Sequence, residues 1–401
     1  MEKKYMRKIK KNIVHFLPAL GGDCILLEFD NQECILIDCG YTTTYNQELK
    51  PLLLKLGKQG YRIKLFIVSH IDRDHIEGAI QLLKDNGESN NPQVIKIENI
   101  WFNGFYSTLF MNDAFNQHRS KTISKVQNDK MRIIQGQLEM QLTPTVETIS
   151  AKQSKSFEEL CSELGYQVNC QFPKQVVKRK SDDYKIVAND KISLGDFSIT
   201  VLSPNDFLID KLAHELDIEL IKIFGKNYKI NSDSNFGEFY EKLMILKREE
   251  SINTNVLISA ESHEIEGWLG TSTLAPMNYV NQASIVVQIE YKGMKMLFTG
   301  DSDSELWGDY LEPYYDVIKI SHHGTLKPNL CMINKTEGNH LLISTNGKKY
   351  GHPEKDLVAN LMLNNSRKMH FNYNLDIKEV ILKNQEKYNF KASFGESIIY
   401  L

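Results

Sequence analysis

The chain lacks long apolar runs and a framework of paired cysteines. None of its segments approaches the ~20 apolar residues that a membrane helix needs, and the basic start MEKKYMRKIKKN has no apolar stretch behind it that would mark a secretion signal. The six cysteines include no CxxC pair, which favours reduced thiols and a cytoplasmic protein. The net charge of -3 supplies no general attraction to nucleic acid or membranes, so a polyanionic substrate would need a local patch or a metal centre.

The chain divides into two α/β halves around a long insert. Short apolar runs alternate with helical patterns in 1–102 and again in 281–401, which predicts strands and helices in one α/β domain. From 103 to 280 the chain is polar and mostly helix-compatible, interrupted by a strand-like segment at 191–204. We expect this insert to be a cap, a homodimerisation arm or a docking surface for a protein partner, and the sequence leaves the three open.

A crowded turn, SHIDRDHIEG, follows the apolar run RIKLFIV and precedes a helical pattern. It contains four candidate metal ligands: His70, Asp72, Asp74 and His75. Imidazole and carboxylate groups together suit Zn²⁺, Mn²⁺ or Fe²⁺, and such close spacing would serve two ions. The alternative is a polar loop whose histidines pair with neighbours, but the whole HxDxDH pattern at a strand end favours a metal site.

Three later segments repeat this arrangement. Asp301 follows the apolar run MLF and a Thr-Gly pair, His322 and His323 follow VIKIS, and His352 lies between Gly and Pro after LLISTN. Each residue alone is more often an ordinary turn residue. Their joint occurrence at the ends of predicted strands indicates that they meet the first turn in one metal centre.

HxDxDH, TGD and HHG in this order resemble the metallo-β-lactamase-fold hydrolases, and most closely the soluble hydrolase domain of the competence protein ComEC. The likeness extends to VHFLPALGGDCILLEF, to LIDCG with Asp38, to the Asn-x-x-Ser of Asn281 and Ser284, and to YGHP. It covers roughly 13–102 and 281–353. The resemblance implies an αββα sandwich, in which two sheets lie between helical layers with metals at one edge.

The resemblance also implies how two divalent ions, Zn²⁺ or Mn²⁺, would be held. His70 and Asp72 would bind one ion, Asp74 and His75 would bind the second, and Asp301 would bridge them. Asp72 stands where many members of the wider superfamily have a second His. The usual His before TGD also has no clear counterpart, since His263 lacks matching context and Asn281 is a weak neutral ligand. The first site is therefore oxygen-rich, which favours Mn²⁺ at least as much as Zn²⁺, and single-metal occupancy remains open.

The remaining roles are likewise implied by the resemblance. His322 would complete the second ion's ligand shell, because it lies nearer the strand end than His323. His323 and His352 would contact substrate phosphate or donate protons, and Asp38 would orient a metal ligand. Substrate contacts are also expected from Asn281 and Ser284.

These expectations add up to a metal-dependent phosphodiesterase, chiefly a nuclease acting on DNA or RNA, in which Asp74 orients the attacking water. The basic run KQVVKRK at 174–180, with Phe172 and Tyr184 nearby, could contact phosphates and bases, although a solvated surface segment is the simpler interpretation. Two alternatives remain: a small-molecule hydrolase for a cyclic nucleotide, thioester or lactone, and a metal-free partner-binding module. A deep pocket closed by the insert would favour the former, whereas the intact ligand set argues against the latter.

Overall fold

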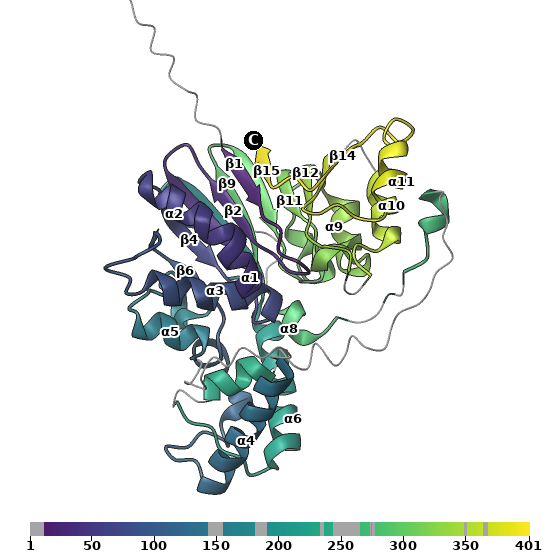
Figure 1. Cartoon of the computed structure of the whole chain (residues 1–401). Helices are drawn as coiled ribbons and strands as arrows, with labels where there is room; N and C mark the ends of the chain where they lie inside the picture. The colour runs from purple at the N-terminus through teal and green to yellow at the C-terminus, as the bar shows by residue number, and fades with distance from the viewer. Residues whose placement is uncertain are drawn as a thin grey trace, which may run out of the picture.

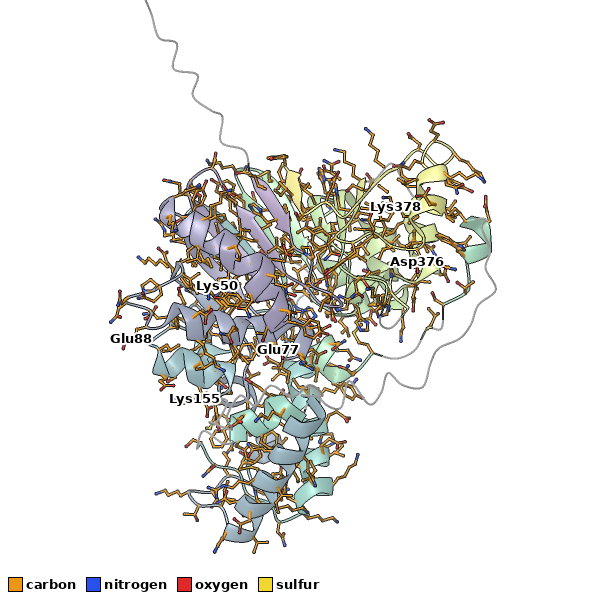
Figure 2. The ribbon with its side chains drawn as sticks, viewed as in Figure 1. Lys50, Glu77, Glu88, Lys155, Asp376 and Lys378 are labelled. Atoms are coloured by element: carbon orange, nitrogen blue, oxygen red, sulfur yellow. The ribbon has the colours of Figure 1, made fainter. Side chains whose placement is uncertain are left out.

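The protein folds as two β-sheets that face each other, with helices on both outer faces (Figure 1). The computed structural model describes residues 12–142, 155–180, 191–232, 236–243, 265–272, 274, 277–348, 351–363 and 368–401. None of the helices in these ranges is long and apolar enough to cross a membrane. Charged side chains cover the outer helices on both sides, as Lys50 on one side and Lys378 on the other illustrate (Figure 2).

The first sheet is built almost entirely from the N-terminal 100 residues. Its strand order is β15 (Ile398–Tyr400), β1 (Ile13–Phe16), β2 (Ile25–Glu28), β3 (Glu33–Ile37), β4 (Arg62–Ile67) and β5 (Lys96–Ile97), with β6 (Ile100–Trp101) also paired to β4. The outer face is covered by α1 (Thr42–Thr44), the π-helical turn Tyr45–Leu49, α2 (Lys50–Lys58) and α3 (Arg73–Asn86). Strands β3, β4 and β5 run parallel, so their carboxyl ends lie at one edge.

The second sheet contains the C-terminal strands. Its order is β14 (Lys391–Phe394), β13 (Lys368–Phe371), β12 (Glu337–Ile343), β11 (Tyr314–Lys319), β10 (Met294–Phe298), β9 (Val286–Tyr291), β8 (Phe197–Ser203) and β7 (Lys191–Leu194). Strands β10 to β14 run parallel, and β7 to β10 alternate in direction. Helices α9 (Leu330–Lys335), α10 (Lys355–Leu363) and α11 (Lys378–Lys383) cover its outer face.

Three apolar layers hold the four structural layers together. Side chains alternate between the two faces of a strand, so Leu27 on β2 packs between the sheets, whereas Leu26 packs under the outer helices. On the second sheet, Val317 lies between the sheets and Ile318 lies beneath the other helical layer. The predicted αββα sandwich is therefore confirmed.

Part of the predicted insert belongs to the sandwich. The strand-like segment expected at 191–204 forms β7 and β8, and β8 pairs with β9 across the former boundary at 280. Ile199 on β8 is fully buried between the sheets. The helices α4 (Lys125–Leu142) and α6 (Asp206–Phe224) form an arm below the sandwich, whereas α5 (Phe157–Glu163) packs near α3 (Figure 1). The insert therefore contributes both an arm and two strands of the sheet.

Candidate metal centre

Loops from both sheets meet at the edge where the parallel strands end. His70 and Asp72 follow β4, and Asp74 and His75 lie in the first turn of α3. Asp301 follows β10, and His323 follows β11. All six side chains are buried, with at most 5% of each residue exposed. The structure therefore brings together residues that are more than 220 positions apart in sequence.

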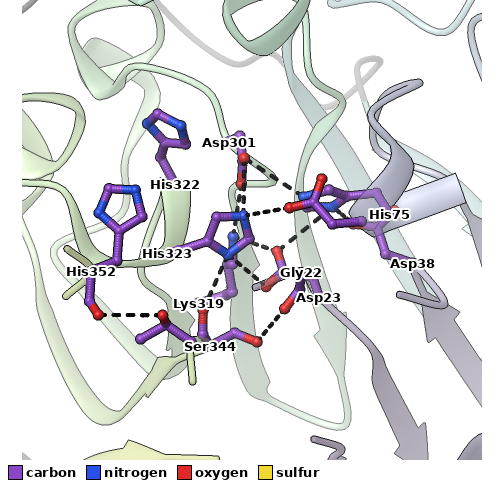
Figure 3. Close-up of polar contacts among 12 residues, drawn as sticks. Gly22, Asp23, Asp38, His75, Asp301, Lys319, His322, His323, Ser344 and His352 are labelled. Carbon is purple, nitrogen blue, oxygen red and sulfur yellow. Dashed lines mark hydrogen bonds and ion pairs between the residues drawn. The ribbon is translucent and has the colours of Figure 1, made fainter. Parts of the chain in front are cut away.

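Three buried imidazoles surround one carboxylate oxygen, Oδ2 of Asp301, and Figure 3 shows two of them, those of His75 and His323. Its distances to the Nε2 atoms are 3.9 Å for His70, 3.6 Å for His75 and 3.3 Å for His323. Asp72 Oδ2 lies 3.2 Å from His70 Nε2, and Asp74 Oδ2 lies 3.5 Å from His323 Nε2. Two overlapping groups result, one around His70 and Asp72 and the other around His323 and Asp74, with Asp301 between them.

Each imidazole is anchored through its other ring nitrogen. His75 Nδ1 lies 2.8 Å from Asp38 Oδ2, and His323 Nδ1 lies 3.1 Å from the Ser344 carbonyl oxygen. His70 Nδ1 lies 2.9 Å from Ser69 Oγ, whose own proton is donated to Asp38 Oδ2. Because these oxygens act as acceptors, Nδ1 carries the proton when a ring is neutral, and the Nε2 lone pair of that neutral ring points into the cluster.

The three Nε2 atoms fit a metal site. All three are buried, and within the described part of the chain none has a hydrogen-bond partner. Buried polar atoms ordinarily find one, so an orphaned lone pair facing carboxylates is the arrangement that a divalent cation would satisfy. Imidazole nitrogen and carboxylate oxygen suit Zn²⁺ and Mn²⁺.

The charge balance supports the same conclusion. Five buried carboxylates gather here, from Asp23, Asp38, Asp72, Asp74 and Asp301. One buried ammonium group, that of Lys319, opposes them, which leaves a charge of -4 when the histidines are neutral. Two divalent cations would balance this charge, and burying it uncompensated would be very costly.

The ionisable groups respond to each other even without cations. Burial by itself lowers the pKa of His75, but the Asp301 and Asp38 carboxylates outweigh burial and raise that pKa well above its ordinary value. For His323, burial is likewise outweighed, chiefly by Asp301, and the pKa rises to about 9. Burial favours a higher pKa for Asp301, yet His323, His75 and Lys319 hold it well below the usual range. The cluster therefore attracts positive charge strongly.

The structure reverses the expected order of the two adjacent histidines. Both have left-handed backbones, with φ of 48° for His322 and 54° for His323, and this turn sends the second ring into the cluster and leaves the first on its rim (Figure 3). His323 is fully buried against Asp301, whereas no cluster of potential ligand atoms among the described residues includes His322. Proximity to the strand end does not predict which histidine enters the cluster, because the backbone of the turn sets the direction of both side chains.

His322 instead forms a rim with two other predicted residues. Its ring centroid is 5.6 Å from that of His352, and its Nε2 is 3.3 Å from Asn281 Nδ2. A cavity of about 630 Å³ opens beside His352. Its lining also includes the backbone turn at Gly347, the buried Trp268 and two lysines, Lys348 and Lys355.

Two predicted residues lie behind the cluster. Ser284, expected to contact substrate, is fully buried, and its Oγ accepts a hydrogen bond of 3.4 Å from the Asp301 backbone N–H. Its position fits support of the Asp301 loop. Asp38 binds both Ser69 and His75 and does not border the rim. His263 lies outside the described residues, as does Tyr184.

Asp23 and Lys319 were missed in the sequence. The Lys319 ammonium group pairs with Asp23 Oδ2, lies 3.3 Å from Asp301 Oδ1 and donates to the Gly300 carbonyl oxygen at 2.6 Å. Asp23 also approaches His323 Nδ1 at 3.7 Å. A signal existed, because Lys319 has the same strand parity as Val317 and therefore had to face the core.

Gly22 allows the segment that carries Asp23 to pack closely against the first turn of α3. A Cβ atom on Gly22 would come within 1.9 Å of the Asp74 carbonyl oxygen, so no larger residue fits there without moving the first turn of α3. The Ser344 hydroxyl donates to the Gly22 carbonyl oxygen at 2.6 Å. The chain segment that carries Asp23 is thus held against both halves of the cluster.

Residues 17–94 match the family model of the metallo-beta-lactamase superfamily, and no curated protein matches the chain. The metallo-beta-lactamase fold protein YhfI from Bacillus subtilis is 9% identical, with a TM-score of 0.37 over 98% of this chain and 100% of that one. Zn(2+)-bound PqqB from Methylobacterium extorquens is 10% identical, with a TM-score of 0.36 and the same coverage.

A mutant of the β-hydroxylase CmlA is 8% identical, with a TM-score of 0.34 over 98% of this chain and 54% of that one. At such identities and TM-scores, these likenesses carry no argument about activity. The family match is more specific, because its segment contains Asp23, Asp38 and the HxDxDH turn. Residues 17–94 are therefore similar to the metallo-beta-lactamase superfamily, and they lie within an αββα sandwich that gathers potential metal ligands at one edge.

Proposed function

We propose that this protein is a metal-dependent phosphodiesterase, and specifically a nuclease that uses two divalent cations. One observation carries the proposal: three buried Nε2 lone pairs, each fixed by an oxygen on Nδ1, converge on Asp301 Oδ2. In the proposed assignment His70 and Asp72 would hold one cation, Asp74, His75 and His323 would hold the other, and Asp301 would contribute to both. This assignment keeps all the expected ligands except His322, which His323 replaces.

The residues around the cluster suit hydrolysis of an anionic ester. Bound divalent cations would supply a water molecule of lowered pKa and positive charge for the transition state. Asp74 is placed to orient the attacking water and to hold its proton. On the rim, His322 or His352 would donate a proton to the leaving alkoxide, and the Asn281 amide would donate a hydrogen bond to a phosphoryl oxygen.

Nucleic acid as the substrate rests on the resemblance of HxDxDH, TGD and HHG to the ComEC-type hydrolase domain. A role of the arm as a cap, a homodimer contact or a partner-docking surface is likewise a proposal. One observation favours a second candidate, a small-molecule hydrolase: the cavity of about 630 Å³ beside His352 falls within the range of ~300–1,000 Å³ that is typical of small-ligand sites.

Metal analysis together with an activity panel tests the proposal. The purified protein would be assayed with single-stranded DNA, double-stranded DNA, RNA, cyclic nucleotides and bis(p-nitrophenyl) phosphate, with Mn²⁺ or Zn²⁺. We expect up to two metal equivalents and cleavage of polynucleotides and of the generic ester. His323→Ala should lose metal and activity together, whereas His322→Ala should retain metal and lower kcat roughly 100-fold.

His214→Ala is the matched control, because His214 is exposed on α6, and it should leave both quantities unchanged. A parent protein that binds no metal would refute the proposal and favour a partner-binding module. Cleavage of cyclic nucleotides or lactones without cleavage of polynucleotides would establish the small-molecule alternative. Loss of metal in His322→Ala but not in His323→Ala would restore the opposite assignment of the two histidines.

A further inference from the structure

The arm leaves the sandwich at the same edge as the metal centre. Ser203 at the end of β8 pairs with Val286 at the start of β9, and the neighbouring Val287 pairs with Phe298 at the end of β10, just before Asp301. Helix α6 then begins at Asp206. Two strand spacings separate β8 from β10, which is on the order of 10 Å. A polymer held at the metal centre could therefore reach the start of α6.

An aromatic and cationic surface lies at that point. Phe207 is 62% exposed, and the Lys211 ammonium group, one helical turn later, lies 5.5 Å from its ring centroid. The same ammonium group lies 4.6 Å from the ring of Tyr279, the first residue of α8 (Tyr279–Gln282). We call Phe207, Lys211 and Tyr279 the aromatic strip.

The aromatic strip connects directly to the rim of the metal centre. Tyr279 and Asn281 belong to the same short helix, and the Asn281 amide is 3.3 Å from His322 Nε2. His322 in turn lies beside His352. A line of neighbouring residues thus runs from the exposed Phe207 ring to the rim of the metal centre.

The basic run at 174–180 docks beside this surface. The Arg179 backbone N–H donates to the Pro204 carbonyl oxygen at 2.7 Å, and the Lys178 ammonium group pairs with Asp206. The Arg179 guanidinium lies 4.1 Å from the ring centroid of Tyr310. The ion pair with Lys178 largely neutralises Asp206, the acidic residue next to Phe207.

A second acidic residue near the aromatic strip, Asp210, is also engaged. Asp210 Oδ1 accepts a hydrogen bond of 2.7 Å from the Asn112 amide. Asp206 and Asp210 therefore both have partners of their own. Basic residues from two separate segments, Lys178 and Arg179 from one and Lys211 from the other, lie near the start of α6.

We propose that the aromatic strip binds a single-stranded polynucleotide next to the phosphate that is cleaved. Phe207 and Tyr279 offer rings on which unpaired bases stack, and Lys211 offers a charge for the intervening phosphate. Bases of a duplex are already stacked on each other, so only an unpaired strand can use both rings. The proposal rests on the proposed function, since it names the form of the substrate.

Binding and turnover are measured separately to test it. Fluorescence anisotropy with labelled single-stranded DNA, single-stranded RNA and double-stranded DNA, in EDTA, reports binding without cleavage. Turnover of bis(p-nitrophenyl) phosphate in Mn²⁺ reports the metal centre alone. We expect Phe207→Ala and Lys211→Ala each to weaken single-strand binding by roughly 5- to 100-fold and to leave turnover of the small ester unchanged.

The controls lie away from this surface. Tyr314 is 46% exposed at the start of β11, and Lys96 lies at the start of β5. Both residues therefore lie at the edge of the sandwich opposite the metal centre. Tyr314→Ala and Lys96→Ala should leave binding unchanged. Relative affinity for the DNA and RNA strands identifies the natural polymer.

Three results would overturn the inference. One is binding of single strands that neither variant weakens, and another is equal weakening of duplex and single-strand binding. The third is no binding of any polynucleotide by the parent protein. In each case, turnover of the small ester still decides whether the proposed metal-dependent hydrolysis stands.

Discussion

At the scale of single residues, Lys319 shows how strongly the metal centre depends on charge. Burial by itself lowers the pKa of this lysine, but Asp23 and Asp301 outweigh burial and raise it. A buried ammonium group costs several kcal/mol to desolvate unless carboxylates compensate it. Lys319 is therefore a positioning residue, which holds Asp301 from the side opposite the imidazoles.

Replacing Lys319 should destabilise the protein sharply. Lys319→Met leaves Asp23 and Asp301 buried without their cation, so we expect the free energy of unfolding to fall by about 3–5 kcal/mol. Urea denaturation measures this in EDTA, which keeps metal binding out of the comparison.

Lys335→Met is the matched control for that experiment. Lys335 pairs with Asp309 at 2.5 Å, but both side chains are exposed, so its substitution should change the free energy of unfolding far less than that of Lys319. Adding Asp23→Asn to Lys319→Met should recover part of the lost stability. Equal effects of the two lysine substitutions would contradict the buried ion-pair network.

At the scale of secondary-structure elements, hydrogen bonds of two buried histidines connect three adjacent strands. His340 on β12 lies 2.9 Å from His370 on β13 through Nδ1 and Nε2, and His370 Nδ1 lies 2.8 Å from Ser393 Oγ on β14. Burial, with Lys368 nearby, lowers the pKa of His340 to about 4. Burial, with His340 and Lys368, lowers the pKa of His370 to about 4. Both rings are therefore neutral at pH 7.

This pair should make stability depend on pH. Unfolded histidines bind protons below about pH 6.5, whereas the folded pair resists protonation until about pH 4. Between these values the unfolded state binds more protons, so stability falls as the pH falls and levels off below about 4. Because the two rings share a hydrogen bond, their contributions are not additive. We expect the free energy of unfolding to fall by a total of roughly 3 kcal/mol.

Urea denaturation between pH 7 and pH 4.5 measures the effect, with His340→Gln/His370→Gln as the comparison. Carboxylates elsewhere titrate equally in both proteins, so the difference between the two curves isolates the pair. The parent should lose more stability on acidification than the double variant. Parallel curves would show that the pair has no such influence.

At the scale of the whole molecule, the candidate metal centre draws its residues from both sheets. His70 to His75 come from the first sheet, and Asp301 and His323 come from the second. Between the sheets at this edge lies a cluster of carboxylates, and not the apolar side chains that fill the rest of the interface. Cations would therefore serve the fold as well as the chemistry.

Removing metal should lower the stability of the whole sandwich. A cation that binds only the folded state stabilises it by about 4 kcal/mol at 1,000 times its dissociation constant. We expect a single unfolding transition whose midpoint falls on chelation with EDTA and recovers when Mn²⁺ or Zn²⁺ is restored. Differential scanning calorimetry measures it, and Asp301→Asn should respond less to added metal. An unchanged midpoint in the parent would contradict a structural role of the cations.

The sequence by itself predicted the strands, and the resemblance carried by its motifs implied the sandwich and most of the cluster. Short apolar runs between turn signals predict strands, and HxDxDH, TGD and HHG are local signals, because each motif follows an apolar run that ends there. The turn SHIDRDHIEG needed no tertiary information to be singled out. Asp38 was likewise found, through a motif that brings it to the end of β3.

Only the tertiary structure decided which side chains converge. His323 enters the cluster in place of His322 because a left-handed turn rotates the pair, and a rotation of this kind leaves no periodic signature. Asp23 and Lys319 matter because they meet across two sheets, and β8 joins the second sheet by pairing with a strand more than 80 residues later. Strands and turns depend on residues that are neighbours in the chain, so they can be predicted from the sequence. Contacts between distant segments depend on how whole layers pack, so they are known only from the tertiary structure.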